Sequence, residues 1–303
     1  MKKIILVNLI MFVIISACNT IPTEVIPTPT AETTTNTEPV GSTLIPQTEQ
    51  PITKDQKILL PEPVQVTFAA EDNQELFGTF FPAARQTAPV IVLMHWYPGD
   101  QYEWTEIANW LQNRGMHGDP DGVPWKDPSW FPELNSEDSY NVLTFTFRGC
   151  SGRCDTFQQN DWLLDAKAAL IFARTLPGVD PDQVISIGAS IGADGAIDGC
   201  AAVLEDDPSA CLGALSFSPG NYLNKQYHDM VTALATNDPP RPAWCFFDIN
   251  DPDSAMCNDI SSVNYHPEGW SGGNLHGMHL ITPNLDPRPL ERMLNFLALV
   301  TEN

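Results

Sequence analysis

Hydrophobic positions follow two alternating patterns from residue 64 to the end of the chain. Short apolar or β-branched runs predict strands at 64–68, 75–81, 90–94, 142–147, 184–187, 212–217 and 243–247. Apolar residues at helical spacing, or small residues in a run, predict helices at 103–114, 160–175, 192–199 and 288–300. Strands that alternate with helices indicate an α/β fold with a mainly parallel central sheet and helices on both faces.

A G-x-S-x-G sequence, Gly188 to Gly192, lies between the predicted strand at 184–187 and the helix that follows it. A sharp turn from strand to helix exposes the hydroxyl of Ser190 at the edge of the sheet. The start of the helix offers free N–H groups to a developing oxyanion. The pattern therefore predicts a serine nucleophile. The alternative is a glycine-rich turn that carries a surface serine.

A serine nucleophile needs a histidine base, and the chain has six histidines. His276 stands beside Gly277 on a glycine-containing segment ahead of the last helix, and it is the favoured base. His279 is the competitor. Taken alone, either histidine is more often a polar loop residue.

The orienting acid is expected at the end of the strand that precedes the histidine loop. Asp251 is favoured there, followed by Asp253 and then Asp248. A solvated acidic turn and a calcium site are alternatives, but Pro252 breaks the spacing of an EF-hand loop.

Residues 116–138 interrupt the alternation and are rich in Gly, Pro and Asp, with Trp125, Trp130 and Phe131 among them. Long loops inside compact domains are usually functional. The segment is either an insertion that supplies aromatic walls near the mouth of the site, or a rigid surface excursion anchored by its own tryptophans.

Composition narrows the classes of function. The chain has 303 residues and a formal net charge of −23, from 38 acidic and 15 basic residues. Such a surface repels nucleic acid and anionic lipid. The chain shows no P-loop, dinucleotide fingerprint or H-E-x-x-H motif, so neither a cofactor nor a metal is expected.

The N-terminus has the features of an export signal. Lys2 and Lys3 precede the apolar segment 4–16, and Ile15-Ser16-Ala17 leads directly into Cys18. This resembles a bacterial lipoprotein signal with Cys18 as the lipidated mature N-terminus; an ordinary secretory signal and an uncleaved anchor are alternatives. The expected organisation is a signal peptide at 1–17, a disordered Thr/Pro-rich linker at 18–56 and a folded domain at 57–303, held at the outside of a bacterial cell by its lipid.

Six cysteines remain once Cys18 is set aside, an even number that suits disulfides in an exported protein. Proximity in the sequence suggests three pairs: Cys150 with Cys154, Cys200 with Cys211, and Cys245 with Cys257. A zinc site is the rival interpretation, but the spacing lacks a C-x-x-C pair.

Together these residues resemble the α/β-hydrolase fold, and within it the dienelactone-hydrolase and small-esterase type. The matches, in order, are His95 after a buried strand, Arg148-Gly149-x-x-Gly152, the turn at Ser190, the acid near Asp251, and His276-Gly277.

The resemblance implies an oxyanion hole formed by the backbone N–H of Ile191 and that of Trp96 or Tyr97, with His95 ordering the loop. Trp96 and Asp248 depart from the family, which usually has glycine at both positions.

The leading hypothesis is a surface-anchored serine hydrolase that cleaves the carboxylic ester of a small-molecule substrate through an acyl-enzyme intermediate. An amidase, peptidase or acyltransferase could use the same three residues. A catalytically silent lipoprotein that binds a ligand or partner is the alternative from another class, and Trp96 and Asp248 favour it.

Overall fold

The computed structural model describes residues 62–118 and 120–302 of the chain. They belong to the second of two units, Lys57–Asn303. The expected signal peptide, the lipidation site at Cys18 and the linker therefore lie outside the described residues.

An eight-stranded sheet forms the centre of this unit, in the order β1-β2-β4-β3-β5-β6-β7-β8. Strand β2 pairs antiparallel with both β1 and β4. From β4 onward, each strand in this order pairs with the next in parallel. The predicted mainly parallel α/β sheet is confirmed. The strands are β1 (Val64–Ala69), β2 (Glu75–Phe81), β3 (Ala88–Met94), β4 (Asn141–Thr146), β5 (Val179–Ala189), β6 (Gly213–Phe217), β7 (Ala243–Asp248) and β8 (Tyr265–Trp270).

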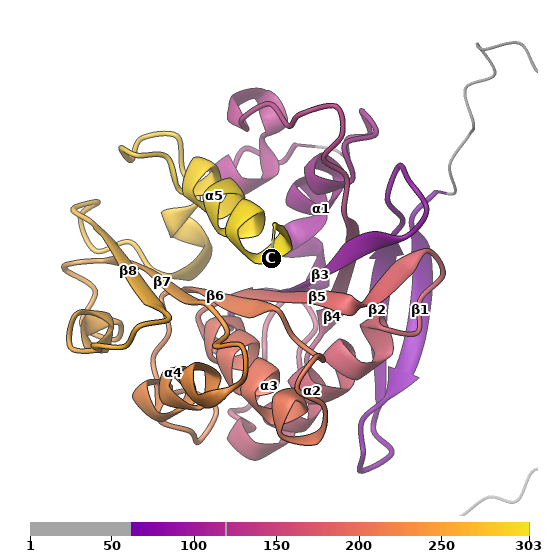
Figure 1. Ribbon diagram of the computed structural model, residues 1–303. Coiled ribbons are helices and arrows are strands. Elements are labelled where there is room, and N and C mark those ends of the chain that lie inside the picture. The colour runs from indigo at the N-terminus through magenta and orange to yellow at the C-terminus, as the bar shows by residue number, and fades with distance from the viewer. Residues whose placement is uncertain (1–61, 119, 303) are drawn as a thin grey trace, which may run out of the picture. The chain divides into compact units, whose positions relative to one another are not determined.

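Helices cover both faces of the sheet (Figure 1). They are α1 (Thr105–Gln112), α2 (Gln159–Ala173), α3 (Ile191–Asp206), α4 (Tyr227–Thr236) and α5 (Pro289–Thr301). One apolar core includes Trp162 of α2 and Ile197 of α3, and the other includes Ile107 of α1 and Phe296 of α5. All residues of β3 are buried, because helices cover both of its faces.

One α-helix and one strand in the described part of the chain were not predicted. Helix α4 occupies part of the 220–240 segment, and only three of its ten residues are buried, so its helical pattern in the sequence is weak. Strand β8 contains Pro267 and Gly269, which are both poor strand residues. The strand tolerates the proline because it lies at the edge of the sheet.

The histidine segment therefore follows β8, not the strand that carries the acids, which corrects the expected order. The helix predicted at 103–114 is also different, because a 3₁₀ turn at Gln101–Trp104 comes before α1.

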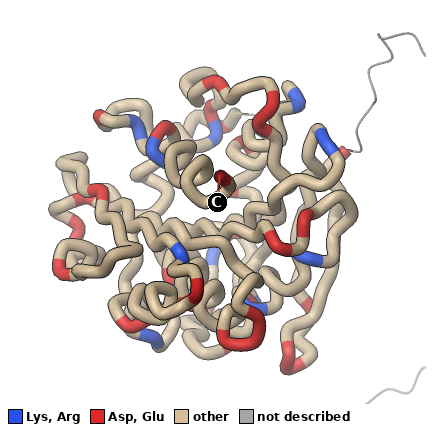
Figure 2. The backbone as a smooth tube through the Cα atoms, in the orientation of Figure 1, with Lys and Arg blue, Asp and Glu red and all other residues tan. Residues whose placement is uncertain are grey.

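Three disulfides join the six cysteines of the described residues, in the pairs that proximity suggested. Disulfides persist mainly outside the reducing cytosol, which favours an extracytoplasmic protein. Acidic residues are spread over loops and helix ends rather than gathered on one face (Figure 2). Within the described ranges, the helices are too short or too polar to cross a bilayer.

Candidate active site

Ser190 stands at the turn between β5 and α3 with a φ of 53° and a ψ of −118°. This is the strained backbone expected of a nucleophile turn. The flanking glycines make it sterically feasible: a Cβ on Gly188 would lie 1.9 Å from the Gly192 carbonyl oxygen, and one on Gly192 would lie 2.3 Å from the Met94 carbonyl oxygen. The motif thus encodes close packing of this turn against the end of β3.

His276 and Asp251 converge on this serine from two other loops. The His276 Nε2 atom lies 2.9 Å from Ser190 Oγ, and its Nδ1 atom lies 2.7 Å from Asp251 Oδ2. Ser190 and Asp251 are buried, whereas the His276 side chain is 29% exposed. The three residues favoured from the sequence are therefore in hydrogen-bonding contact in the order that a serine, a base and an orienting acid require.

The other two candidate acids have different partners. Asp248 accepts hydrogen bonds from the backbone N–H groups of Asn250, Asn274 and Leu275. It thus joins the segment 249–254 after β7, here called the acid loop, to the segment 271–276 after β8, here called the histidine segment. Burial alone would raise the pKa of Asp248, but these hydrogen bonds outweigh it and lower the pKa. The atypical residue thus has a structural explanation.

Asp253 and Ser254 link the acid loop to residues 218–222, which follow β6 and are here called the β6 loop. The Tyr222 hydroxyl donates to Asp253 Oδ2 at 3.1 Å. The Ser254 hydroxyl lies 2.9 Å from Asp251 Oδ2 and 3.0 Å from the Pro219 carbonyl oxygen. Sequence reasoning missed Tyr222 and Ser254, because nothing in their local sequence marks them.

The expected oxyanion donors lie on two elements. Ile191 is the first residue of α3, so its N–H has no partner within the helix. Trp96 and Tyr97 follow β3, and the Tyr97 carbonyl accepts the N–H of Cys154 at 3.1 Å. The ring closed by Cys150 and Cys154 therefore braces the loop on which the second donor is expected.

His95 holds the loop after β3 in place through two hydrogen bonds. Its Nδ1–H donates to the Trp96 carbonyl at 2.7 Å, and its Nε2 accepts the N–H of Phe147 at 3.0 Å. Burial lowers the pKa of His95 to about 4, so the imidazole is neutral at physiological pH and can make both bonds.

An aromatic cluster lies beside the serine. The ring of His279 meets those of Trp96 and Trp125 at centroid distances of 4.9 and 5.2 Å. His279 is thus part of a wall, and the ring that reaches Ser190 belongs to His276. The segment 116–138 supplies Trp125 to this wall, and the indole N–H of Trp125 is anchored on Glu103 at 3.0 Å. Both interpretations of the insertion hold in part.

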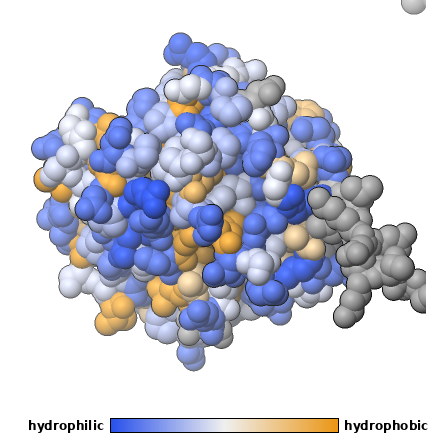
Figure 3. All heavy atoms as spheres, turned by 90° about the horizontal axis from the view of Figure 1, so that it is seen from above, coloured by the Kyte–Doolittle hydropathy of each residue, from blue (hydrophilic) through white to orange (hydrophobic). Residues whose placement is uncertain are grey.

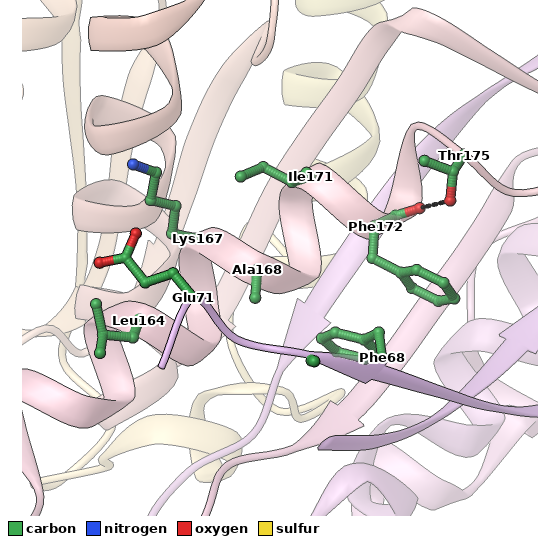
Figure 4. Close-up of a pocket in the computed structure, with 9 residues that line it drawn as sticks. Phe68, Glu71, Leu164, Lys167, Ala168, Ile171, Phe172 and Thr175 are labelled. Carbon is green, nitrogen blue, oxygen red and sulfur yellow. Dashed lines mark hydrogen bonds between the residues drawn. The ribbon is translucent and has the colours of Figure 1, made fainter. Parts of the chain in front are cut away.

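Of two cavities in the described residues, one lies beside the site that holds Ser190 and His276 and the other does not. One of about 340 Å³ is lined by Trp125, Leu275 and His279 and so adjoins the site. A larger one, of about 430 Å³, lies between β1 and α2 around Phe68 and Phe172 (Figure 4). The residues that line the larger cavity do not include Ser190, Asp251 or His276. Seen from above, the molecule is mostly hydrophilic with small separate apolar areas (Figure 3).

Among the described residues, one group could hold a metal ion: the possible ligand atoms of Asp251, Asp253 and His276 lie within 4.8 Å of one another. Asp251 Oδ2 and His276 Nδ1 already bind each other. A metal held there would break the contact between acid and base, so the arrangement suits proton transfer better than metal binding.

Comparison with known proteins places the chain in a family. The model of the acetyl xylan esterase (AXE1) family matches residues 48–223, which is more than half of the chain. The chain belongs to the acetyl xylan esterase (AXE1) family. The match includes Ser190 but ends before Asp251 and His276, so the evidence for the acid and the base is their geometry.

Curated relatives match over a shorter region. The uncharacterized protein YfhR of Salmonella typhi is 28% identical over 145 residues, which span 46% of this chain and 41% of that protein. YfhR of Escherichia coli strain K12 is 29% identical over 147 residues, which span 48% of this chain and 45% of the relative. The matched region is thus less than half the length of these relatives.

Solved structures confirm the α/β-hydrolase fold. The α/β hydrolase GrgF from Penicillium sp. sh18 matches with a TM-score of 0.56 and 14% identity, over 80% of this chain and all of that one. The Pyrococcus furiosus esterase Pf2001 matches with a TM-score of 0.52 and 17% identity, over 78% of this chain and 92% of the other. At these identities, the likeness concerns the fold alone.

Proposed function

We propose that this protein is a serine hydrolase that cleaves carboxylic esters through an acyl-enzyme intermediate. The observation that carries the proposal is the pair of contacts made by His276, at 2.9 Å to Ser190 Oγ and 2.7 Å to Asp251 Oδ2. Membership of an esterase family supports the same reaction.

The proposed first half-reaction is acylation. His276 takes the proton of Ser190 as its oxygen attacks the ester carbonyl, and Asp251 stabilises the resulting imidazolium. The N–H of Ile191 and that of Trp96 or Tyr97 bind the oxyanion. Collapse of the tetrahedral intermediate breaks the ester bond, and His276 gives its proton to the leaving alcohol.

In the second half-reaction, water attacks the acyl-enzyme. His276 removes a proton from the water and returns it to the Ser190 oxygen when the acid product leaves. Both half-reactions use the same oxyanion donors.

We further propose that the acyl group is small, with acetyl esters as the substrate class suggested by the family's name. The space around the serine supports this. A Cβ placed on Gly277 would lie 3.5 Å from Ser190 Cβ and 3.0 Å from the Trp96 ring, so these residues pack closely beside the nucleophile.

The test uses a fluorophosphonate probe and 4-nitrophenyl esters. The native chain is expected to be labelled and to hydrolyse the acetate faster than the octanoate, and Ser190→Ala is expected to lose both labelling and activity. A folded native chain that resists the probe and hydrolyses neither ester would contradict the proposal and favour a silent binding protein.

A further inference from the structure

We infer that Asp194 is a positioning residue that fixes the acid and the base of the triad relative to Ser190, by holding the β6 loop against which both pack. The inference rests on the proposed function. It concerns a carboxylate that does not touch the reacting atoms and lies in the first turn of α3, just after the nucleophile.

The contacts of Asp194 all lead to the β6 loop. Its side-chain oxygens accept the backbone N–H of Tyr222 and, at 3.3 Å, that of Gly220. The residue is 1% exposed, so water cannot take over these bonds. Removal of the carboxylate therefore leaves the N–H groups of Tyr222 and Gly220 without their acceptor and the loop without its anchor.

The β6 loop in turn is linked to the acid through Ser254 and contacts the base directly. Its Pro219 carbonyl and Asp251 Oδ2 share the hydroxyl of Ser254. Its Tyr222 donates to Asp253 and places its ring edge-on to His276, with the centroids 6.2 Å apart. The loop is thus a support for both partners of the serine.

These contacts form a closed circuit. It starts at Ser190, passes along one turn of α3 to Asp194, crosses to the β6 loop and continues through Asp251 and His276 back to the Ser190 hydroxyl. Because one rigid helix carries both the nucleophile and the anchor, displacement of the loop is also displacement relative to the serine.

The choice of an acid supports a specific task. Burial raises the pKa of Asp194 to about 7 in spite of the backbone hydrogen bonds, so the folded protein bears a cost to keep a carboxyl group there.

Asp198 provides a matched control. It lies one turn further along α3 and is 2% exposed, and its Oδ2 atom has no hydrogen-bond partner. Asp194 and Asp198 thus share helix, charge and burial, but the bonds to the β6 loop described above belong to Asp194.

The experiment measures kcat and KM for 4-nitrophenyl acetate, together with the melting temperature, in the full chain. Asp194→Ala is expected to lower kcat by about 10- to 100-fold with KM changed less than about twofold, because a misplacement of about 1 Å has an effect of that size. Asp194→Asn, which keeps one acceptor oxygen, is expected to retain more activity than the alanine variant. Asp198→Asn is expected to stay within about twofold of the native kcat.

The outcomes separate the two proposals. If native and variant chains are all inactive and unlabelled by fluorophosphonate, the proposed function fails. If the native chain is active and both Asp194 variants keep its kcat, the positioning role alone is overturned. Equal losses of kcat in the Asp194 and Asp198 variants, in step with their melting temperatures, would overturn it as well. A smaller probe of one link, Tyr222→Phe, is expected to lower kcat even if Asp194→Ala does not fold.

Discussion

Three aspartates lie within six residues of the chain, and each has a different role because its neighbours differ. Asp248 caps backbone N–H groups, Asp251 faces the imidazole of His276, and Asp253 accepts the hydroxyl of Tyr222. Asp251 is buried, whereas Asp253 is exposed. An aspartate side chain thus anchors a loop at 248, is the proposed orienting acid at 251, and binds a tyrosine hydroxyl group at 253.

These surroundings predict a graded response to amide substitution. Asp251→Asn is expected to lower kcat on 4-nitrophenyl acetate by about 10⁴-fold, because an amide cannot stabilise the imidazolium or hold the correct tautomer. Asp253→Asn keeps an acceptor for Tyr222 and is expected to lose less than about tenfold. Equal losses in the two variants would contradict the assignment of Asp251 as the acid.

The raised pKa of Asp194 predicts a pH effect on stability. Between the ordinary value of 3.8 and about 7, the folded state holds a proton that the unfolded state has released, so this residue's contribution to stability falls as pH rises through that window. The free energy involved is on the order of 4 kcal/mol. Asp194→Asn should therefore flatten the stability profile from pH 4 to 7.

Urea unfolding at several pH values checks this effect. Asp198, whose pKa burial also raises, remains in the variant and keeps part of the slope. A variant whose unfolding free energy depends on pH as steeply as that of the native chain would show that Asp194 titrates normally.

At the scale of elements, strands with continuous apolar runs were predictable because burial on both faces leaves a strong signal. The G-x-S-x-G turn was predictable because close backbone packing requires its glycines. Strand β8 and helix α4 were not, since Pro267 disfavours a strand and only three of the ten residues of α4 are buried, which leaves a weak helical pattern. Their placement depends on neighbours that are distant in the sequence.

The candidate site divides in the same way. Ser190, His276 and Asp251 follow strand ends or glycines, so their positions could be deduced from the chain order. Tyr222 and Ser254 contribute through contacts between loops, which no local pattern reveals.

The disulfide between Cys245 and Cys257 encloses the acid loop, which contains Asp251. Replacing both cysteines by serine is expected to destabilise the fold by about 3 kcal/mol and to lower kcat, because the acid is then less firmly placed. The pair Cys200 and Cys211 closes a loop of similar length away from the acid.

Removing that second pair serves as the control: a similar fall in melting temperature with an unchanged kcat is expected. Both double variants should be compared below their melting temperatures. If both lose kcat to the same degree, the acid loop has no special dependence on its disulfide.

At the scale of the whole molecule, the cellular location of the protein is expected to depend on its N-terminal segment. We propose that Cys18 carries a lipid and that the linker 18–56 connects this anchor to the folded domain. In a bacterial host, the native chain is expected in the membrane fraction. Cys18→Ala is expected to move most of the protein to the soluble fraction, as separated by Triton X-114 partition. A native chain that partitions into the aqueous phase would contradict the proposal.

The six cysteines of the described residues pair two by two in chain order: 150 with 154, 200 with 211, and 245 with 257. A polypeptide that emerges from a translocation pore with its amino end first presents these partners two at a time. Each bond can then close before a later thiol arrives to compete for it. Such nearest-neighbour connectivity reduces the need for an isomerase to sort wrong pairings.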